Sequence, residues 1–314
     1  MTAPLTVAAV DCGTNSIRLL ITRREADGTL TEITRENTIV RLGQGVDETG
    51  RFNPEAIERT RQALAAYTER MRAEGVERVH MVATSATRDA ENREDFFAMT
   101  RALLGQIQPG AQAEVISGDE EAHLSFLGAT ADINPARGPF CVIDLGGGST
   151  EFVMEQGARS TQMGCVRVTE RFMRTDPPTK EETAAARSYI RERIAEAAEA
   201  VPFDQARTFV GCAGTFTTLS ALAQGLDTYD PERIHMSEIP FDRMREVTAD
   251  LRARTAKQRL EYGPIHPGRA DVIGSGSTVV EEMMDAFEQE AGASSFIISE
   301  KDILDGIVTG LLAD

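Results

Sequence analysis

The sequence predicts an α/β protein built from two copies of one structural unit. Apolar segments typical of buried strands alternate with segments of helical periodicity along most of the chain. A strand, an Asp-x-Gly-x-x-Ser loop and a second strand occur twice, and one offset of 133 residues relates Asp11 to Asp144 and Ser16 to Ser149. The length of 314 residues also suits two domains of about 100–200 residues each. We interpret the repeat as an internal duplication whose two loops face a shared cleft.

The first half is expected to hold three antiparallel strands and then alternating helices and strands. Asp27-Gly28 is a preferred hairpin dipeptide, and Asn53-Pro54 supplies an N-cap followed by proline at the first helical position. In chain order the expected elements are strands at 5–10, 17–22 and 30–40, a helix from 54, a strand at 80–83, a helix at 94–104, a strand at 113–116 and a helix at 120–128.

The second half follows a linker rich in proline and glycine at 134–139 and repeats the opening pattern. Its expected elements are strands at 140–143 and 152–154, a helix at 180–200, a strand at 208–210, small-residue loops at 211–215 and 271–276, a strand at 296–299 and a helix from 299. The two domains are therefore expected at 1–130 and 131–298.

The composition excludes several classes of protein. The chain has 33 Lys and Arg against 50 Asp and Glu residues, a net charge of −17, whereas nucleic-acid binders rely on basic surfaces. No apolar run approaches the ~18 residues of a membrane span, and residues 1–5 lack the pattern of a leader. The four cysteines and four histidines are scattered without metal-ligand spacing. We expect a cytoplasmic protein with no nucleic-acid partner, no membrane association and no zinc site.

The two repeated loops are candidates for phosphate binding. Glycine-rich loops can aim several backbone N–H groups at one anion, although a single such loop is often only a tight turn. Asp11 and Asp144 each end a strand ahead of a loop and could hold a hard cation such as Mg²⁺, which would offset the negative charge of the protein. Arg18, Arg88 and Arg93 are the nearby cationic candidates.

Acidic residues near position 120 are candidates for a general base. Ser117-x-x-Glu120 forms a capping box, which explains Glu120 without catalysis. Asp119 or Glu121 could then orient a water molecule for attack, and the spacing does not choose between them. Glu151 lies two residues after Ser149 and could face a metal or a water molecule, or simply the solvent.

Six segments together resemble the Ppx/GppA phosphatase family, the exopolyphosphatases and guanosine pentaphosphate phosphohydrolases. The similarity spans most of the chain and is greatest to short two-domain exopolyphosphatases of the actinobacterial type. The segments, in family order, are 11–16, 83–88, 117–122, 144–151, 163–166 and 214–215.

This resemblance implies a fold of two duplicated ribonuclease-H-like domains, the actin-like or ASKHA architecture, with an inter-domain cleft. It also implies that the last helix, at 299–314, packs on the first domain. The implied activity is Mg²⁺-dependent hydrolysis of the terminal phosphoanhydride of inorganic polyphosphate, which releases orthophosphate, and Mn²⁺ is an alternative cation. Release of the 5′-phosphate of guanosine pentaphosphate (pppGpp) at the same site is a second hypothesis.

The resemblance also implies residue roles. Glu121 matches the catalytic glutamate of the family. Asp144 and Glu151 match the positions associated with the metal and the attacking water, and we add Asp11 as a third candidate metal ligand. The phosphate-binding positions are Asn15, Ser16, Arg88, Gly146, Gly147, Gly148 and Ser149.

Two hypotheses from other classes stay open, because a fold alone does not decide function. One is a kinase of the same fold that transfers a phosphoryl group to an organic acceptor. The other is a non-catalytic sensor of phosphate or of the alarmones pppGpp and ppGpp. A homodimer is likewise left open.

Overall fold

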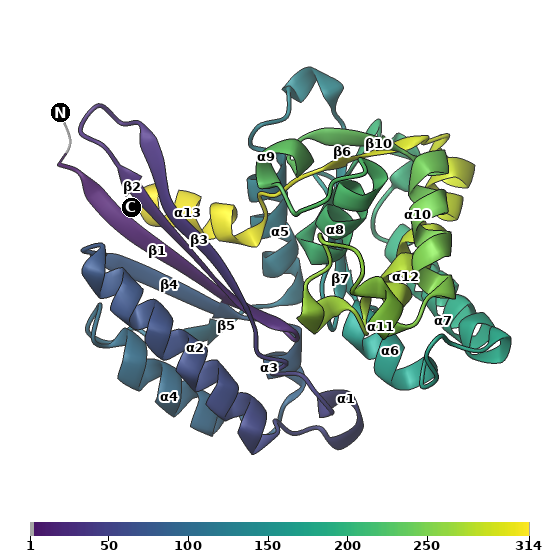
Figure 1. Cartoon of the computed structure of the whole chain (residues 1–314). Helices are drawn as coiled ribbons and strands as arrows, with labels where there is room; N and C mark the ends of the chain where they lie inside the picture. Colours follow the sequence, from purple (N-terminus) through teal and green to yellow (C-terminus); the bar gives the residue numbers. More distant parts are fainter. Residues whose placement is uncertain (1–2, 314) are drawn as a thin grey trace. The chain divides into compact units, whose positions relative to one another are not determined.

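The computed structural model describes residues 3–313 (Figure 1). Residues 1–2 and 314, the outer ends of the expected domains, lie outside the described residues. Within the described part of the chain, none of the helices combines the length and the apolar composition that a membrane crossing requires.

The chain divides into two compact units. Unit 1 runs to Leu124 and resumes at Ile303, and unit 2 is Ser125–Asp302. The division falls within helix α5 (Gly118–Thr130), earlier than the boundary expected after residue 130. The cleft implied between the two domains stays a prediction.

Unit 1 is built on a five-stranded mixed sheet with the order β3-β2-β1-β4-β5. The first three strands pair antiparallel, and β1, β4 and β5 run parallel, so their carboxyl ends meet at one edge of the sheet. The strands are β1 (Leu5–Cys12), β2 (Ser16–Arg24), β3 (Leu30–Ile39), β4 (Arg78–Ala83) and β5 (Ala113–Val115).

Helices cover both faces of this sheet, as Figure 1 shows. Helices α2 (Pro54–Ala73) and α4 (Glu94–Leu104) cover one face, and the predicted start of α2 is confirmed because the Asn53 side chain accepts a hydrogen bond from the Glu55 N–H group. On the other face, α13 (Ile303–Ala313) buries Ile303 and Ile307 against β1 and β2. The short helices are α1 (Val46–Thr49) and α3 (Ser85–Asp89).

Unit 2 contains a six-stranded sheet with the order β10-β11-β9-β6-β7-β8. Five of its strands, β8-β7-β6-β9-β11, repeat the order and directions of the unit 1 sheet, which confirms the predicted duplication. The strands are β6 (Phe140–Leu145), β7 (Thr150–Met154), β8 (Gly157–Thr161), β9 (Thr208–Cys212), β10 (Ser237–Pro240) and β11 (Ser295–Ile298).

The core of unit 2 lies between its sheet and the surrounding helices. Phenylalanine side chains make ring contacts within it, and the rings of Phe209 and Phe287 stack with their centroids 4.2 Å apart. The helices of unit 2 are α6 (Cys165–Phe172), α7 (Lys180–Ala198), α8 (Ala213–Ala223), α9 (Pro231–Ile234), α10 (Phe241–Ala253), α11 (Ala256–Arg259) and α12 (Ile273–Ala291).

The structure corrects two loops expected in the second half. Most of the segment 271–276 belongs to α12, and its glycines allow close packing: a Cβ on Gly276 would lie 2.9 Å from the Thr215 side chain. The segment 211–215 is the end of β9 and the start of α8, with no loop between them. Ala213 adopts a left-handed conformation with φ of 66°, which lets the chain turn directly from strand to helix.

Candidate active site

The glycine loop of unit 2 joins β6 to β7 and is anchored on α6. The Gly146 N–H group donates to the Ser149 carbonyl oxygen at 3.1 Å and closes the turn. The carbonyl oxygens of Gly146 and Gly147 accept hydrogen bonds of 2.9–3.1 Å from the first backbone N–H groups of α6. The Gly148 carbonyl oxygen accepts a 2.7 Å hydrogen bond from Arg167 Nε. The loop is therefore held through its carbonyl groups.

This anchoring turns three backbone amides away from α6. In a planar trans peptide the N–H group lies opposite the carbonyl oxygen, so the N–H groups of Gly147, Gly148 and Ser149 face the other side of the loop. Among residues 3–313, no backbone carbonyl accepts a hydrogen bond from these three amides. Consecutive amides that face one side form a nest for an anion, and a phosphate group suits it.

The corresponding loop of unit 1 joins β1 to β2 and is anchored in the same way. The Gly13 N–H group donates to the Ser16 carbonyl oxygen at 3.0 Å, as in unit 2. The Thr14 carbonyl oxygen accepts from the Gly43 N–H group at 2.9 Å, and that of Asn15 accepts two further backbone N–H groups. The predicted phosphate contacts of unit 1, Asn15 and Ser16, thus lie at a turn whose backbone carbonyl groups are held by hydrogen bonds from residues 40–43.

Two buried carboxylates lie side by side in unit 2. Asp144 and Glu151 are directly opposite each other on the antiparallel strands β6 and β7, so their side chains share one face of the sheet. They are 6% and 1% exposed. The Asp144 Oδ2 atom accepts a 2.6 Å hydrogen bond from the Ser125 hydroxyl, and the Glu151 Oε1 atom accepts one of 2.7 Å from the Ser160 hydroxyl.

This pair of carboxylates fits a hard divalent cation. Mg²⁺ is commonly held by one or two carboxylates and completes its coordination with water and substrate phosphates. Among the described residues, no group of three or more His, Cys, Asp or Glu side chains is placed to hold a metal ion. Asp144 and Glu151 are the residues that would hold the cation.

Asp11, the third predicted metal ligand, lies opposite a cation instead. Arg18 faces it across β1 and β2, and its Nε and Nη2 atoms donate to Asp11 Oδ2 at 3.0 and 2.8 Å. The guanidinium group supplies the positive charge that a metal ion would otherwise bring. The geometry therefore favours Asp144 and Glu151 over Asp11 as the cation ligands.

Glu121 and Arg88 form an ion pair in unit 1. The Arg88 Nη1 atom donates to Glu121 Oε2 at 2.8 Å and to the Ile116 carbonyl oxygen at 3.0 Å. The second terminal nitrogen of Arg88, Nη2, is buried and has no hydrogen-bond partner among the described residues. An unsatisfied buried donor is costly, and a phosphate oxygen would satisfy it.

Burial distinguishes the acidic residues in the first turn of α5. The Ser117 hydroxyl accepts from the Glu120 N–H group at 3.2 Å, which confirms the predicted N-cap. Asp119 and Glu120 are exposed to solvent, whereas Glu121 is 8% exposed. Glu121 is therefore the carboxylate of this turn whose environment suits a general base, a choice that spacing alone left open.

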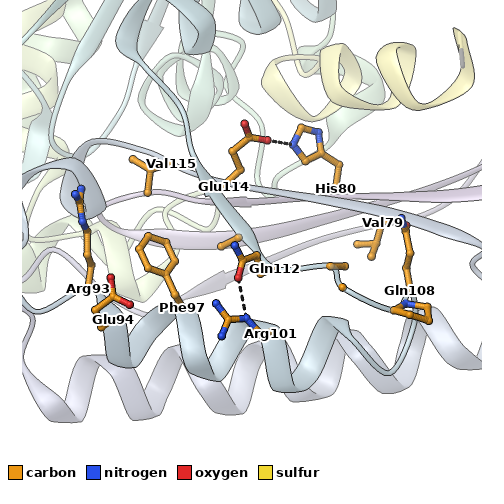
Figure 2. Close-up of a pocket in the computed structure, with 14 residues that line it drawn as sticks. Val79, His80, Arg93, Glu94, Phe97, Arg101, Gln108, Gln112, Glu114 and Val115 are labelled. Atoms are coloured by element: carbon orange, nitrogen blue, oxygen red, sulfur yellow. Dashed lines mark hydrogen bonds and ion pairs between the residues drawn. The ribbon is translucent and has the colours of Figure 1, made fainter.

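Arg93, a third cationic candidate, lines a separate feature of unit 1. Figure 2 shows it beside an open groove of about 980 Å³ between α4 and β5. Among the residues that line this groove, Arg101 of α4 donates to Gln112 at 2.9 Å, and His80 of β4 pairs with Glu114 of β5 at 3.0 Å. The groove carries acidic and basic side chains together.

Three contacts of the predicted site residues were not predicted from the sequence. Ser160 faces Glu151 across the turn between β7 and β8, and hairpin register could have indicated it. The ion pair of Arg88 with Glu121 and the hydrogen bond of Ser125 with Asp144 join positions far apart in the sequence, and no local signal marks them.

A duplicated α/β fold with anchored glycine loops and buried carboxylates defines a protein that handles phosphate groups. The Ppx/GppA phosphatase family matches residues 20–311, and the chain belongs to this family. The predicted two-domain α/β fold and the predicted hydrolase class are thereby confirmed.

Similar proteins agree with this membership. Exopolyphosphatase 2 of Mycobacterium tuberculosis is 54% identical over 312 residues, which cover 97% of this chain and 98% of that protein. The crystal structure of an exopolyphosphatase-like protein has 41% identity and a TM-score of 0.92, with 99% of this chain and 98% of the other covered. The Ppx/GppA family member of Aquifex aeolicus has 30% identity and a TM-score of 0.80, with 99% and 98% covered.

Proposed function

We propose that this protein is a cytoplasmic exopolyphosphatase, which hydrolyses the terminal phosphoanhydride of inorganic polyphosphate and releases orthophosphate. The observation that carries the proposal is the anchored loop 146–149, whose amides face away from α6 and which joins the two strands that carry Asp144 and Glu151. The 54% identity to a protein named Exopolyphosphatase 2 supports the choice of substrate.

In this proposal unit 2 binds the terminal phosphate. The amides of Gly147, Gly148 and Ser149 donate to its oxygens, while Asp144 and Glu151 hold Mg²⁺, or Mn²⁺ in its place. A bound divalent cation neutralises negative charge on the phosphoryl oxygens. Both contributions stabilise the charge distribution of the transition state, and positioning with electrostatics supplies most of the rate in phosphoryl transfer.

Glu121 acts on the attacking water. Its carboxylate accepts the proton as the water oxygen forms a bond to the terminal phosphorus and the bond to the bridging oxygen of the next phosphate breaks. Arg88 holds one oxygen of Glu121 in place, and its Nη2 atom is the donor that would bind a phosphoryl oxygen. The products are orthophosphate and a polyphosphate chain one unit shorter.

A paired substitution in the first turn of α5 tests this assignment. Glu121→Ala should lower kcat for phosphate release by about 10²–10⁴-fold, because the base is lost while the phosphate contacts remain. Glu120→Ala is the matched control, because Glu120 is an exposed glutamate of the same turn, and its kcat should stay within about twofold of wild type. Near-normal turnover of Glu121→Ala would refute the base role.

Hydrolysis of pppGpp is the second candidate. The site would bind only a terminal phosphate, and in both polyphosphate and pppGpp this phosphate is attached through a phosphoanhydride bond. Release of orthophosphate from long polyphosphate, tripolyphosphate and pppGpp, each with and without Mg²⁺, separates the candidates by kcat/KM. Binding of these compounds without any release would favour a sensor, and transfer of phosphate from a nucleotide to an organic acceptor would favour a kinase.

A further inference from the structure

Ser125 makes an unusual hydrogen bond for a serine in the middle of a helix. Its side chain is fully buried in α5, and its hydroxyl donates to the Asp144 Oδ2 atom at 2.6 Å. Helical serines and threonines commonly donate to the backbone carbonyl four residues earlier, as Thr130 of the same helix does to Phe126 at 2.7 Å. The Ser125 hydroxyl is instead directed at a carboxylate of the candidate site.

The bond to Ser125 orients the Asp144 carboxylate without supplying charge. A distance of 2.6 Å lies in the range of hydroxyl donors to an ionised carboxylate, which are among the stronger hydrogen bonds. In unit 1 the equivalent carboxylate, Asp11, is held by the guanidinium group of Arg18, which brings a positive charge. A neutral donor can fix the rotation of a carboxylate without adding a positive charge beside it.

We propose that Ser125 is a positioning residue for the divalent cation: its buried hydroxyl fixes the Asp144 carboxylate in the orientation that binds the ion. The proposal rests on the proposed cation site at Asp144 and Glu151. Groups that hydrogen-bond metal ligands typically contribute 10–100-fold to metal affinity, because they set the direction of the ligand atoms. Ser125 also lies one helical turn after Glu121 in α5, so one helix carries the base and the residue that orients Asp144.

Four substitutions separate positioning from simple packing. Ser125→Ala removes the hydroxyl and keeps nearly the same volume, and Ser125→Cys keeps a side chain of similar size with a weak donor. Ser125→Thr retains a hydroxyl and serves as the rescue. Ser277→Ala is the matched control, because the Ser277 hydroxyl is also fully buried in unit 2 but donates to the Ile273 carbonyl oxygen of its own helix.

The readout is Mn²⁺ binding to the full-length protein without substrate, measured by electron paramagnetic resonance, together with the melting temperature. Ser125→Ala and Ser125→Cys should raise the Mn²⁺ dissociation constant about tenfold or more, while Ser125→Thr and Ser277→Ala stay within about threefold of wild type. In the phosphate-release assay the Mg²⁺ concentration for half-maximal rate should rise by the same factor. Ser125→Cys decides the question if Ser125→Ala fails to fold.

The outcomes separate this inference from the proposed function. An unchanged or tighter Mn²⁺ dissociation constant in folded Ser125→Ala or Ser125→Cys overturns the positioning role, and the cation site stands if Asp144→Asn still abolishes binding. If the wild-type protein binds no Mn²⁺, or if Asp144→Asn binds Mn²⁺ as tightly as the wild type does, both the cation site and the positioning role are overturned.

Discussion

The two copies of the strand–loop–strand motif share a backbone and differ in charge. In both, a glycine N–H group closes the loop onto a serine carbonyl, at 3.0 Å in unit 1 and 3.1 Å in unit 2. The residue opposite the aspartate differs: Asp11 faces Arg18, whereas Asp144 faces Glu151. Duplication has therefore kept the turn and reversed the sign of one side chain.

This difference indicates a division of roles between the units. Two carboxylates directly opposite each other on one sheet face repel when both are ionised, and a bound cation would remove this penalty. The ion pair of Asp11 and Arg18 carries no such penalty. Unit 2 is thus suited to attract a cation together with a phosphate group, and unit 1 has its charge balanced internally at the same position.

Among the changes that test this division of roles, the largest effect is expected from removing the second carboxylate of unit 2. Glu151→Gln should raise the Mn²⁺ dissociation constant by at least 10-fold and lower the rate of phosphate release by about 10²–10³-fold, because one of the two proposed cation ligands loses its charge. Electron paramagnetic resonance and the phosphate-release assay measure the two effects. Wild-type Mn²⁺ affinity in this variant would remove the basis for the division of roles.

A smaller effect is expected from the glycines that lie behind the two loops. A Cβ on Gly164 would come within 2.2 Å of the Gly147 backbone oxygen, whereas one on Gly43 would meet the Thr14 methyl group at 2.3 Å. Backbone atoms move aside less readily than a side chain does. Gly164→Ala should therefore displace the loop 146–149 and lower kcat/KM by about 10²-fold. Gly43→Ala should cost less than about tenfold. Equal losses in the two variants would show that the loops contribute equally.

The smallest effect on catalysis is expected from Arg18 in unit 1. Arg18→Gln removes the ion pair with Asp11 and should lower the free energy of unfolding by about 1–3 kcal/mol, as urea denaturation would measure. Because Arg18 balances charge in unit 1, Mn²⁺ affinity should stay within about threefold of wild type. A large change in Mn²⁺ affinity would instead place Asp11 among the cation ligands.

The sequence is informative where structure depends on neighbouring residues. The loops after β1 and β6 were predicted because each follows an apolar strand and carries Asp, Gly and Ser at the same spacing, a local pattern that is visible in both copies. Glycine and serine also predicted a loop at 271–276, and this prediction is wrong. Gly276 lies in α12, where it allows close packing against Thr215. Small residues suit both a tight turn and the close packing of a helix, and only the tertiary structure distinguishes the two cases.

By itself, the sequence determined the α/β class, the duplication and the two loops, since strand periodicity and turn chemistry are local properties of the chain. Tertiary structure decided which distant side chains meet: Arg88 with Glu121, and the Ser125 hydroxyl with Asp144. Such pairs depend on strand order and helix placement, which follow from the burial of whole apolar faces. Residues that pair across long sequence separations produce no periodic pattern in the sequence.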